Sequence, residues 1–348
     1  MNSTIHDVAR IANVSISTVS RVLNDSAPVS DPKRTRVLDA ISTLNFTPNP
    51  IAQCLIGHPT GTIGAILPHI SGEFFADLLS GLDAAVKHHH YTLMVTASRR
   101  VESDFMVALK AMHKRVDGLI VMSPELTSDH VRSLISTDIP VVFLNTETSP
   151  QDTPSVNFDN SGGMKMIGEH LVELGHSRIA YISGPKGAYD ALQRWRGFNE
   201  SIPNHVTVSY YQGDFTFKSG YDIASQILTS SARPSAIAAS NDLSALGAMR
   251  ALLEHGVRIP DDIAVTGFDG TASAYFSTPS LTTVNIPIGH LSANAVNILI
   301  KHLSKCGSHE STQVNTPIDL IIRESTQSFH SCTQTSSSQE TPAMIGQS

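Results

Sequence analysis

The sequence predicts an α/β protein in which a three-helix head and a hinge precede two lobes of doubly wound parallel sheet. Three observations predict this fold class. The N-terminal stretch has apolar residues at helical spacing, a Pro- and Gly-rich stretch follows, and from Gly61 short apolar runs alternate with amphipathic helical segments. The expected domains are a helix-turn-helix head at 1–46, a hinge helix and linker at 47–60, a two-lobed domain at 61–326 and a disordered tail at 327–348.

Residues 4–24 predict two short helices joined by a tight turn. Thr4 can cap the first helix, with Asp7 as the acidic member of a capping box, and Ser15 can cap the second after a left-handed turn at Asn13. The inward faces repeat at helical spacing: Ile5, Val8, Ala9 and Ala12 in the first helix, and Val19, Val22 and Leu23 in the second. Two helices of an ordinary core would show the same spacing, but it also fits a helix-turn-helix, whose second helix enters the DNA major groove.

A third helix follows the helix-turn-helix. Ser30 can cap it, Pro32 is tolerated in its first turn, and Val37, Ile41 and Leu44 give it one apolar stripe. Phe46 is expected to complete the core of this small head. Between 47 and 61 the chain is a linker, in which only 51–56 can form a helical turn or two.

The two lobes are predicted from alternating strands and helices. The strands of the first lobe are expected at 63–67, 92–96, 118–122 and 141–144, and its helices at 74–89, 102–114 and 128–136. The strands of the second lobe are expected at 179–182, 206–211, 236–239 and 263–267, and its helices at 164–174, 195–201, 218–228 and 243–255. Ligands bind beyond the carboxyl ends of parallel strands, so a cleft between the lobes is expected.

Composition narrows the class of protein. A length of 348 residues with 41% hydrophobic content predicts two or three domains, and the absence of a long apolar run or a signal segment predicts a cytoplasmic protein without a membrane span. The cysteines Cys54, Cys306 and Cys332 are too far apart for a zinc or disulfide framework. The net charge of −7 is uneven: five basic and four acidic residues in 1–58 leave the acidity in the remainder.

Polar side chains at strand ends are the candidate ligand-binding groups. Asn145 ends one strand, Asn241 follows another, Asp269 follows a third, and Arg194 is placed at the start of a helix. Such groups can fix the hydroxyls of a sugar or nucleobase ligand, while an aromatic residue covers a ring face. Purely structural roles are the alternatives. Asp242 can cap a helix, Phe75 can belong to the hydrophobic core, and Arg194 can form a surface salt bridge.

Other chemistries are disfavoured. The consecutive histidines at 88–90 point in different directions around a helix, so they make a poor metal site. The chain has no GxSxG, GxxxxGK[ST] or HExxH motif, and we expect neither an enzyme nor a cofactor. A free periplasmic binding protein would suit a two-lobed cleft, but the head argues against it.

Several segments of the sequence resemble those of a known protein family. TIHDVARIANVSISTVSRVLN followed by FTPNPIAQCL resembles the DNA-binding head and hinge of the LacI/GalR (lactose/purine repressor) family. The phrases VNFDNSGG, RWRGF and SNDLSALGAMRALLEHGVRIPDDIAVTGFDG resemble the effector domain of that family, which is like periplasmic sugar-binding proteins. The resemblance covers nearly the whole chain.

The resemblance implies a dimeric repressor, or a tetramer of the same chain, that binds a near-palindromic operator of a carbohydrate or nucleoside utilisation operon. Its effector would be a sugar, a sugar derivative or a nucleoside, and whether that effector releases DNA or promotes binding stays open. The implied DNA-binding residues are Thr4, Ser15, Ile16, Ser17, Thr18, Ser20, Arg21, Asn24, Arg34, Asn49, Ala52 and Leu55. The implied effector-binding residues are Phe75, Asn145, Arg194, Phe215, Asn241, Asp269 and Ile288. The alternative is a cytoplasmic sugar-binding module whose head mediates protein association.

Overall fold

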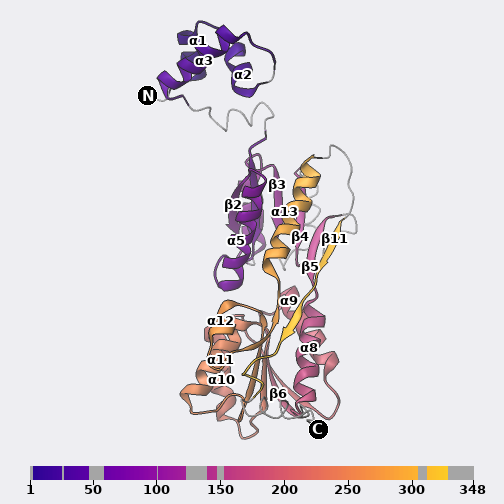
Figure 1. Cartoon of the computed structure of the whole chain (residues 1–348). Coiled ribbons are helices and arrows are strands. Elements are labelled where there is room, and N and C mark those ends of the chain that lie inside the picture. Colours follow the sequence, from indigo (N-terminus) through magenta and orange to yellow (C-terminus); the bar gives the residue numbers. More distant parts are fainter. Residues whose placement is uncertain are drawn as a thin grey trace, which may run out of the picture. The chain divides into compact units, whose positions relative to one another are not determined.

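The computed structural model divides into two compact units, residues 1–60 and 61–348, which Figure 1 shows. It describes residues 3–25, 27–46, 59–99, 101–122, 139–146, 153–304 and 312–327. Several predictions fall outside these ranges: the hinge residues Asn49, Ala52 and Leu55, the helix at 128–136, the three cysteines and almost all of the tail. None of the helices in the described ranges is both long and apolar enough to cross a membrane.

The first unit contains the three predicted helices, α1 (Ile5–Ala12), α2 (Ile16–Asn24) and α3 (Asp31–Leu44). The predicted capping box is confirmed, because the Thr4 side chain accepts from the Asp7 amide and the Asp7 carboxylate accepts from the Thr4 amide. Ser15 caps α2 by accepting from the Thr18 amide, and Asn13 has the left-handed φ of 52° that the turn requires. Ser30 precedes α3 as predicted, but its side chain makes no capping hydrogen bond.

The core of the head takes one fully buried valine from each helix. Val8, Val19 and Val37 have no exposed surface, and Phe46 packs against the cluster that they form. Burial of a valine side chain stabilises a fold by roughly 1.5–3 kcal/mol, so these contacts matter in a unit of this size. The predicted inward faces of the three helices are therefore confirmed.

The second unit consists of two lobes, each built on a six-stranded sheet. In the first lobe the strands β1 (Thr62–Leu67), β2 (Thr92–Ala97), β3 (Gly118–Val121), β4 (Val141–Leu144), β5 (Ser155–Phe158) and β11 (Gln313–Thr316) are all parallel, in the order β11-β5-β4-β3-β1-β2. Its helices are α5 (Glu73–His88), α6 (Glu102–Met112) and α13 (Ile288–Ser304). Figure 1 shows α5 and α13 together beside this sheet.

The second lobe repeats the arrangement with one antiparallel strand. Its strands are β6 (Arg178–Ile182), β7 (Thr207–Tyr211), β8 (Ala236–Ala239), β9 (Ala264–Asp269), β10 (Thr282–Asn285) and β12 (Asp319–Ile321), in the order β12-β10-β9-β8-β6-β7, with β12 antiparallel to β10. Its helices are α8 (Asn160–Glu173), α9 (Tyr189–Ser201), α10 (Phe217–Thr229), α11 (Asp242–Glu254) and α12 (Ala272–Phe276).

Alternating side chains on the strands pack against helices on both faces of each sheet. On β6, Ile179 and Tyr181 join the cluster that contains Phe198 of α9, while Ala180 and Ile182 join the cluster of α10 and α11. On β1, Ile63 and Leu67 face α5 and α13, and Ile66 faces α6. Both faces are buried, which explains why these strands read as continuous apolar runs.

All eight predicted strands are confirmed with bounds within two residues, but the described ranges also contain four strands and two helices that were not predicted. The missed strands β5, β10, β11 and β12 have three or four residues each and all contain at least one Ser, Thr, Asn, Asp or Gln, so they lack the apolar run that marks the others. The missed helix α13 follows Pro287 and has no Ser, Thr, Asp or Asn cap, and α12 has only five residues.

The order of the elements determines where a site can form. The chain passes from the first lobe to the second after β5, returns after β10 to form α13, and crosses again between β11 and β12. Both sheets turn the carboxyl ends of β1, β4, β8 and β9 toward loops that meet at one cavity. This is the position at which open parallel sheets bind ligands.

Candidate functional site

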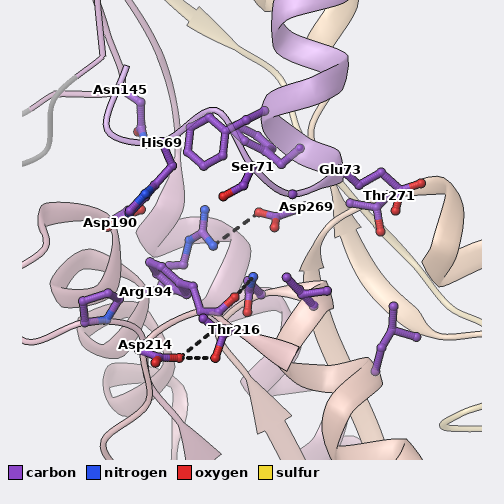
Figure 2. A pocket seen from close by; sticks show the side chains of 18 of the residues that line it. His69, Ser71, Glu73, Asn145, Asp190, Arg194, Asp214, Thr216, Asp269 and Thr271 are labelled. Carbon is purple, nitrogen blue, oxygen red and sulfur yellow. Dashed lines mark hydrogen bonds and ion pairs between the residues drawn. The ribbon is translucent and has the colours of Figure 1, made fainter. Parts of the chain in front are cut away.

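A cavity of about 530 Å³ lies between the two lobes of the second unit, and Figure 2 shows the side chains around it. Its volume is within the range of small-molecule binding sites. Residues from both lobes line it: His69, Ser71, Gly72, Glu73, Phe74, Phe75, Met122 and Asn145 from the first lobe, and Pro185, Asp190, Arg194, Asp214, Phe215, Thr216, Asn241, Leu243, Leu246, Asp269 and Thr271 from the second.

The structure places six of the seven predicted effector-binding residues on this cavity. Ile288 is the exception, because it begins α13 and packs against the hydrophobic core instead. Phe75 has both of the roles considered for it, since it lines the cavity and also packs against the same core. Because α13 was not predicted, the position of Ile288 at its first turn could not be anticipated.

Arg194 is buried in the middle of the second-lobe wall and is 4% exposed. Its Nε donates to Asn160 Oδ1 at 2.9 Å, and its Nη1 donates to the Ser240 carbonyl at 2.6 Å and to Asp269 Oδ1 at 3.4 Å. The guanidinium carbon lies 3.9 Å from the centroid of the Phe268 ring, so the cation stacks on the face of this ring. The alternative of a surface salt bridge is therefore wrong, and so is the predicted placement at a helix start, because α9 begins five residues earlier at Tyr189.

Asp269 is the buried partner of Arg194 at the end of β9. Burial raises the pKa of Asp269 to about 8, the 3.4 Å bond to Arg194 opposes the rise, and the nearby Asp242 and Asp190 increase it. The long contact to Arg194 does not offset the lost hydration of the carboxylate. We therefore expect the carboxyl of Asp269 to hold its proton at neutral pH, where it is a hydrogen-bond donor.

The raised pKa of Asp269 predicts a pH-dependent stability. The unfolded chain loses this proton near the ordinary value of 3.8 and the folded chain near 8, so between these values the folded state binds one more proton and stability falls as pH rises. Asp269→Asn removes this contribution. The unfolding free energy of the wild type should fall relative to that of the variant by about 1.4 kcal/mol per pH unit near pH 6.

Urea unfolding at several pH values can measure this difference through Trp195, the one tryptophan of the sequence, which lies on α9 next to Arg194. Parallel pH dependences for the wild type and Asp269→Asn would contradict a raised pKa.

Asn241 caps α11, whereas the sequence predicts Asp242 for this role. Asn241 caps α11 by accepting from the Ser244 amide at 3.1 Å, so the prediction that Asp242 is the cap is wrong. Asp242 lies in the first turn and is 1% exposed; its carboxylate accepts from the amide and hydroxyl of Thr271 and from the hydroxyl of Thr283. Burial raises the pKa of Asp242, and these hydrogen bonds oppose the rise. Asp242 thus fixes the loop that follows Asp269.

Three of the cavity residues have strained backbones. Asn145, Phe215 and Asp269 have positive φ angles of 44°, 68° and 129°. Such conformations are costly for residues other than glycine and cluster at functional sites. The Phe215 ring also lies directly on the backbone of Gly184, where a β-carbon would be only 2.1 Å from Cζ of Phe215. The fold therefore fixes both the backbone and the ring of this aromatic residue.

Sequence reasoning missed several polar residues of the cavity wall, chiefly His69, Glu73, Asp190, Asp214 and Thr271. A signal existed for three of them. His69, Asp214 and Thr271 follow β1, β7 and β9 by two or three residues, which is the strand-end rule that identified Asn145 and Asp269. Asp190 is one helical turn before Arg194, but this relation was hidden because the start of α9 was placed too late.

In the head, the predicted base-reading residues are largely at the surface. Ile16 is 41% exposed, and Ser17 and Arg21 are exposed on the same helix. Within the part of the chain that the structure describes, Arg21 forms neither a hydrogen bond nor an ion pair, whereas Arg34 pairs with Asp25. Thr4 and Ser15 serve as caps, and Asn24 donates to Ser20 Oγ at 3.3 Å.

Metal coordination has no support among the described residues, where no group of three or more His, Cys, Asp or Glu side chains is placed to hold an ion. In the histidine run, His89 Nε2 lies 2.9 Å from Asn297 Oδ1 of α13, and the rings of His88 and His89 meet edge to face.

Comparisons with known proteins give matches for the head and for part of the two-lobed unit. Residues 4–49 match the family described as bacterial regulatory proteins, lacI family, and residues 169–326 match a periplasmic binding protein-like domain. Catabolite control protein A of Priestia megaterium is 32% identical over 94% of this chain and the whole length of that protein. The chain belongs to the lacI family. The family predicted from the sequence is therefore confirmed.

Another relative and a solved structure also match nearly the whole chain. The ribose operon repressor of Halalkalibacterium halodurans is 35% identical and covers 93% of this chain and 97% of its own length. The Lac repressor dimer bound to operator and to the anti-inducer ONPF is 29% identical, covers 94% of this chain and 99% of its own, and has a TM-score of 0.80. The predicted fold class is thereby confirmed, and this lacI-family chain is a ligand-responsive DNA-binding transcriptional regulator.

Proposed function

We propose that the protein is a homodimeric repressor that binds a near-palindromic operator and is switched by a sugar or nucleoside held between its lobes. The observation that carries this proposal is the buried Arg194, which reaches a cavity of about 530 Å³ in a chain that also has a helix-turn-helix head. Of the relatives described above, one is named as a ribose operon repressor and another as catabolite control protein A. We propose no catalytic step.

The head supplies the operator contacts in this proposal. The exposed Ile16, Ser17 and Arg21 lie on the first two turns of α2, the helix that a helix-turn-helix places in the major groove. An apolar Ile suits the thymine methyl group, Ser can bond to several bases, and Arg can bond to guanine through two donors. Thr4 and Ser15 hold the ends of the helices and can also offer hydroxyls to phosphates.

Switching requires that the effector bind two arrangements of the lobes with different affinities. Glu73 of the first lobe provides one contact between them, because both of its carboxylate oxygens accept from the Ser273 amide of the second lobe at 3.2 Å. A ligand that draws the cavity walls together would favour this contact. We propose that the change reaches the head through the hinge at 47–60; its direction, toward release or toward tighter DNA binding, is the quantity to be measured.

Base selection by α2 is the first test of the DNA-binding role. Replacing Ile16 and Ser17 together should change the preferred operator sequence, at a cost of about 1–3 kcal/mol for each lost base contact. A randomised-operator selection would measure the preference of the wild type and of the double variant. The same preference in both would contradict the assignment of these residues.

A mobility-shift assay with DNA from upstream of the gene separates the proposal from its alternative. A repressor should retard this fragment, and an effector should alter the retardation. A sugar-binding module whose head only mediates protein association would leave the fragment free at every concentration tested.

A further inference from the structure

The wall of the effector cavity carries more acidic than basic groups. Among the described residues that line it, Glu73, Asp190, Asp214 and Asp269 are the acids and Arg194 is the permanent cation. Figure 2 shows Arg194 pointing into the space between Asp190 and Asp269, with Asp214 and Glu73 farther out on opposite sides. An anionic group that entered the cavity would meet this single guanidinium and several carboxyl groups at once.

Arg194 has little left to offer to an anion. Its Nε and Nη1 already donate to Asn160, to the Ser240 carbonyl and to Asp269. Among the interactions of the described residues, Nη2 is the nitrogen without an acceptor. Strong phosphate recognition by arginine usually uses two parallel N–H donors, and that geometry is not free here.

The acidic residues divide into two kinds. Glu73 and Asp214 are held by neighbours, since Glu73 accepts from the Ser273 amide and Asp214 Oδ1 accepts from the amide and hydroxyl of Thr216. Asp190 is different, because it is 9% exposed and only its Oδ1 is used, by the Ala191 amide of its own helix. Within the described chain no donor reaches Asp190 Oδ2, so this oxygen can accept a further hydrogen bond.

On the basis of the proposed function, we propose that the effector is an uncharged, unphosphorylated sugar and that Asp190 is the residue that excludes its phosphate esters. The inner site offers complementary groups to neutral hydroxyls. A hydroxyl can donate to Asp190 Oδ2 while another accepts from Arg194 Nη2, and Phe75 and Phe215 supply apolar surface for the ring. The phosphate group of a sugar ester has lost most of its second proton near neutral pH, so it is a poor donor to Asp190 and carries a charge of the same sign as a carboxylate.

Asp190→Asn tests this selectivity with little change in size. Binding can be followed by Trp195 fluorescence, with free pentoses, hexoses and disaccharides and with matched esters such as ribose 5-phosphate and glucose 6-phosphate. The wild type should bind at least one free sugar, and its ester about tenfold more weakly or worse, as expected for a nearby like charge. Asp190→Asn should reduce that ratio and should acquire affinity for inorganic phosphate.

Asp77→Asn is the matched control, because Asp77 is an exposed carboxylate on α5 outside the cavity wall. It should leave the ratio between free sugar and ester unchanged. An ester that binds the wild type as tightly as the free sugar would overturn the proposal, as would an unchanged ratio in Asp190→Asn or a panel in which no uncharged sugar binds. Operator retardation in the same preparation reports separately on the proposed function, so a wrong ligand class is distinguished from a wrong function.

Discussion

Arg194→Ala is expected to abolish the response to the effector while operator binding is retained. Among the described residues that line the cavity, Arg194 is the only permanent cation, and its guanidinium is held in place by Asn160, Ser240 and the Phe268 ring. Its loss removes the donor that would meet the ligand and leaves buried acceptors without a partner, which costs more than an ordinary hydrogen bond. The head contains its own core and caps, so it should still bind DNA.

The same helix offers a matched control. Arg196 lies two residues after Arg194 but points to the surface, where it pairs with Glu200 at 2.8 Å. Arg196→Ala removes the same side chain from an exposed ion pair, which contributes little to stability. It should leave the effector response unchanged. Mobility shifts with and without effector would compare the two variants, and a normal response in Arg194→Ala would place the effector site elsewhere.

Arg194→Lys would separate charge from geometry. Lysine keeps the positive charge but cannot donate to Asn160, Ser240 and the ligand at once from a planar group. The response should therefore be strongly weakened in this variant as well. A full response in Arg194→Lys would show that charge alone suffices at this position.

The accuracy of the structure predicted from the sequence depends on how far apart along the chain the interacting residues lie. The head could be predicted nearly in full, because its signals are local: Asp7 is three residues from Thr4, and Thr18 is three residues from Ser15. The cap of α3 shows the limit of such reasoning. Ser30 has the right residue type and position, yet its side chain makes no capping bond.

In the lobes, long-range pairing replaces local signals. β11 (Gln313–Thr316) is a strand because β5 offers it a parallel partner, and β12 because β10 offers it an antiparallel one. Neither pairing is visible in a window of a few residues. The central strands could be predicted because burial on both faces demands continuous apolar side chains.

Residue patterns alone predict the cavity residues that end a strand better than those on helices, whereas the assignment of the helical residues Phe75 and Arg194 to the effector came from the family resemblance. Asn145 and Asp269 follow strands that the sequence predicts, so their convergence could be expected. Asp190 and Glu73 lie in the first turns of α9 and α5, and their approach to the cavity depends on where each helix begins and how it packs. No residue pattern specifies that packing.

Gly247→Ala is expected to destabilise the second lobe by about 2–3 kcal/mol, which is a large part of the stability of a typical domain. Gly247 of α11 lies against the backbone of α10, where an added β-carbon would be 2.0 Å from the Phe217 carbonyl oxygen and 3.0 Å from the Tyr221 nitrogen. Gly220 of α10 meets the Ser244 backbone in the same way. No rotamer change relieves an overlap with backbone, so the two helices must separate.

Gly289→Ala is the control, because the same substitution should not lower the stability at this position. Gly289 is in the first turn of α13, and a β-carbon there meets no atom within 4 Å. Alanine favours a helix over glycine by up to about 1 kcal/mol, so this variant should be neutral or slightly more stable. The same preference acts in Gly247→Ala but is outweighed by the overlap with α10. Urea unfolding can be followed by Trp195 fluorescence, and only Gly247→Ala should have a lower midpoint than the wild type. Equal midpoints for the two variants would mean that α10 and α11 are not in backbone contact in solution.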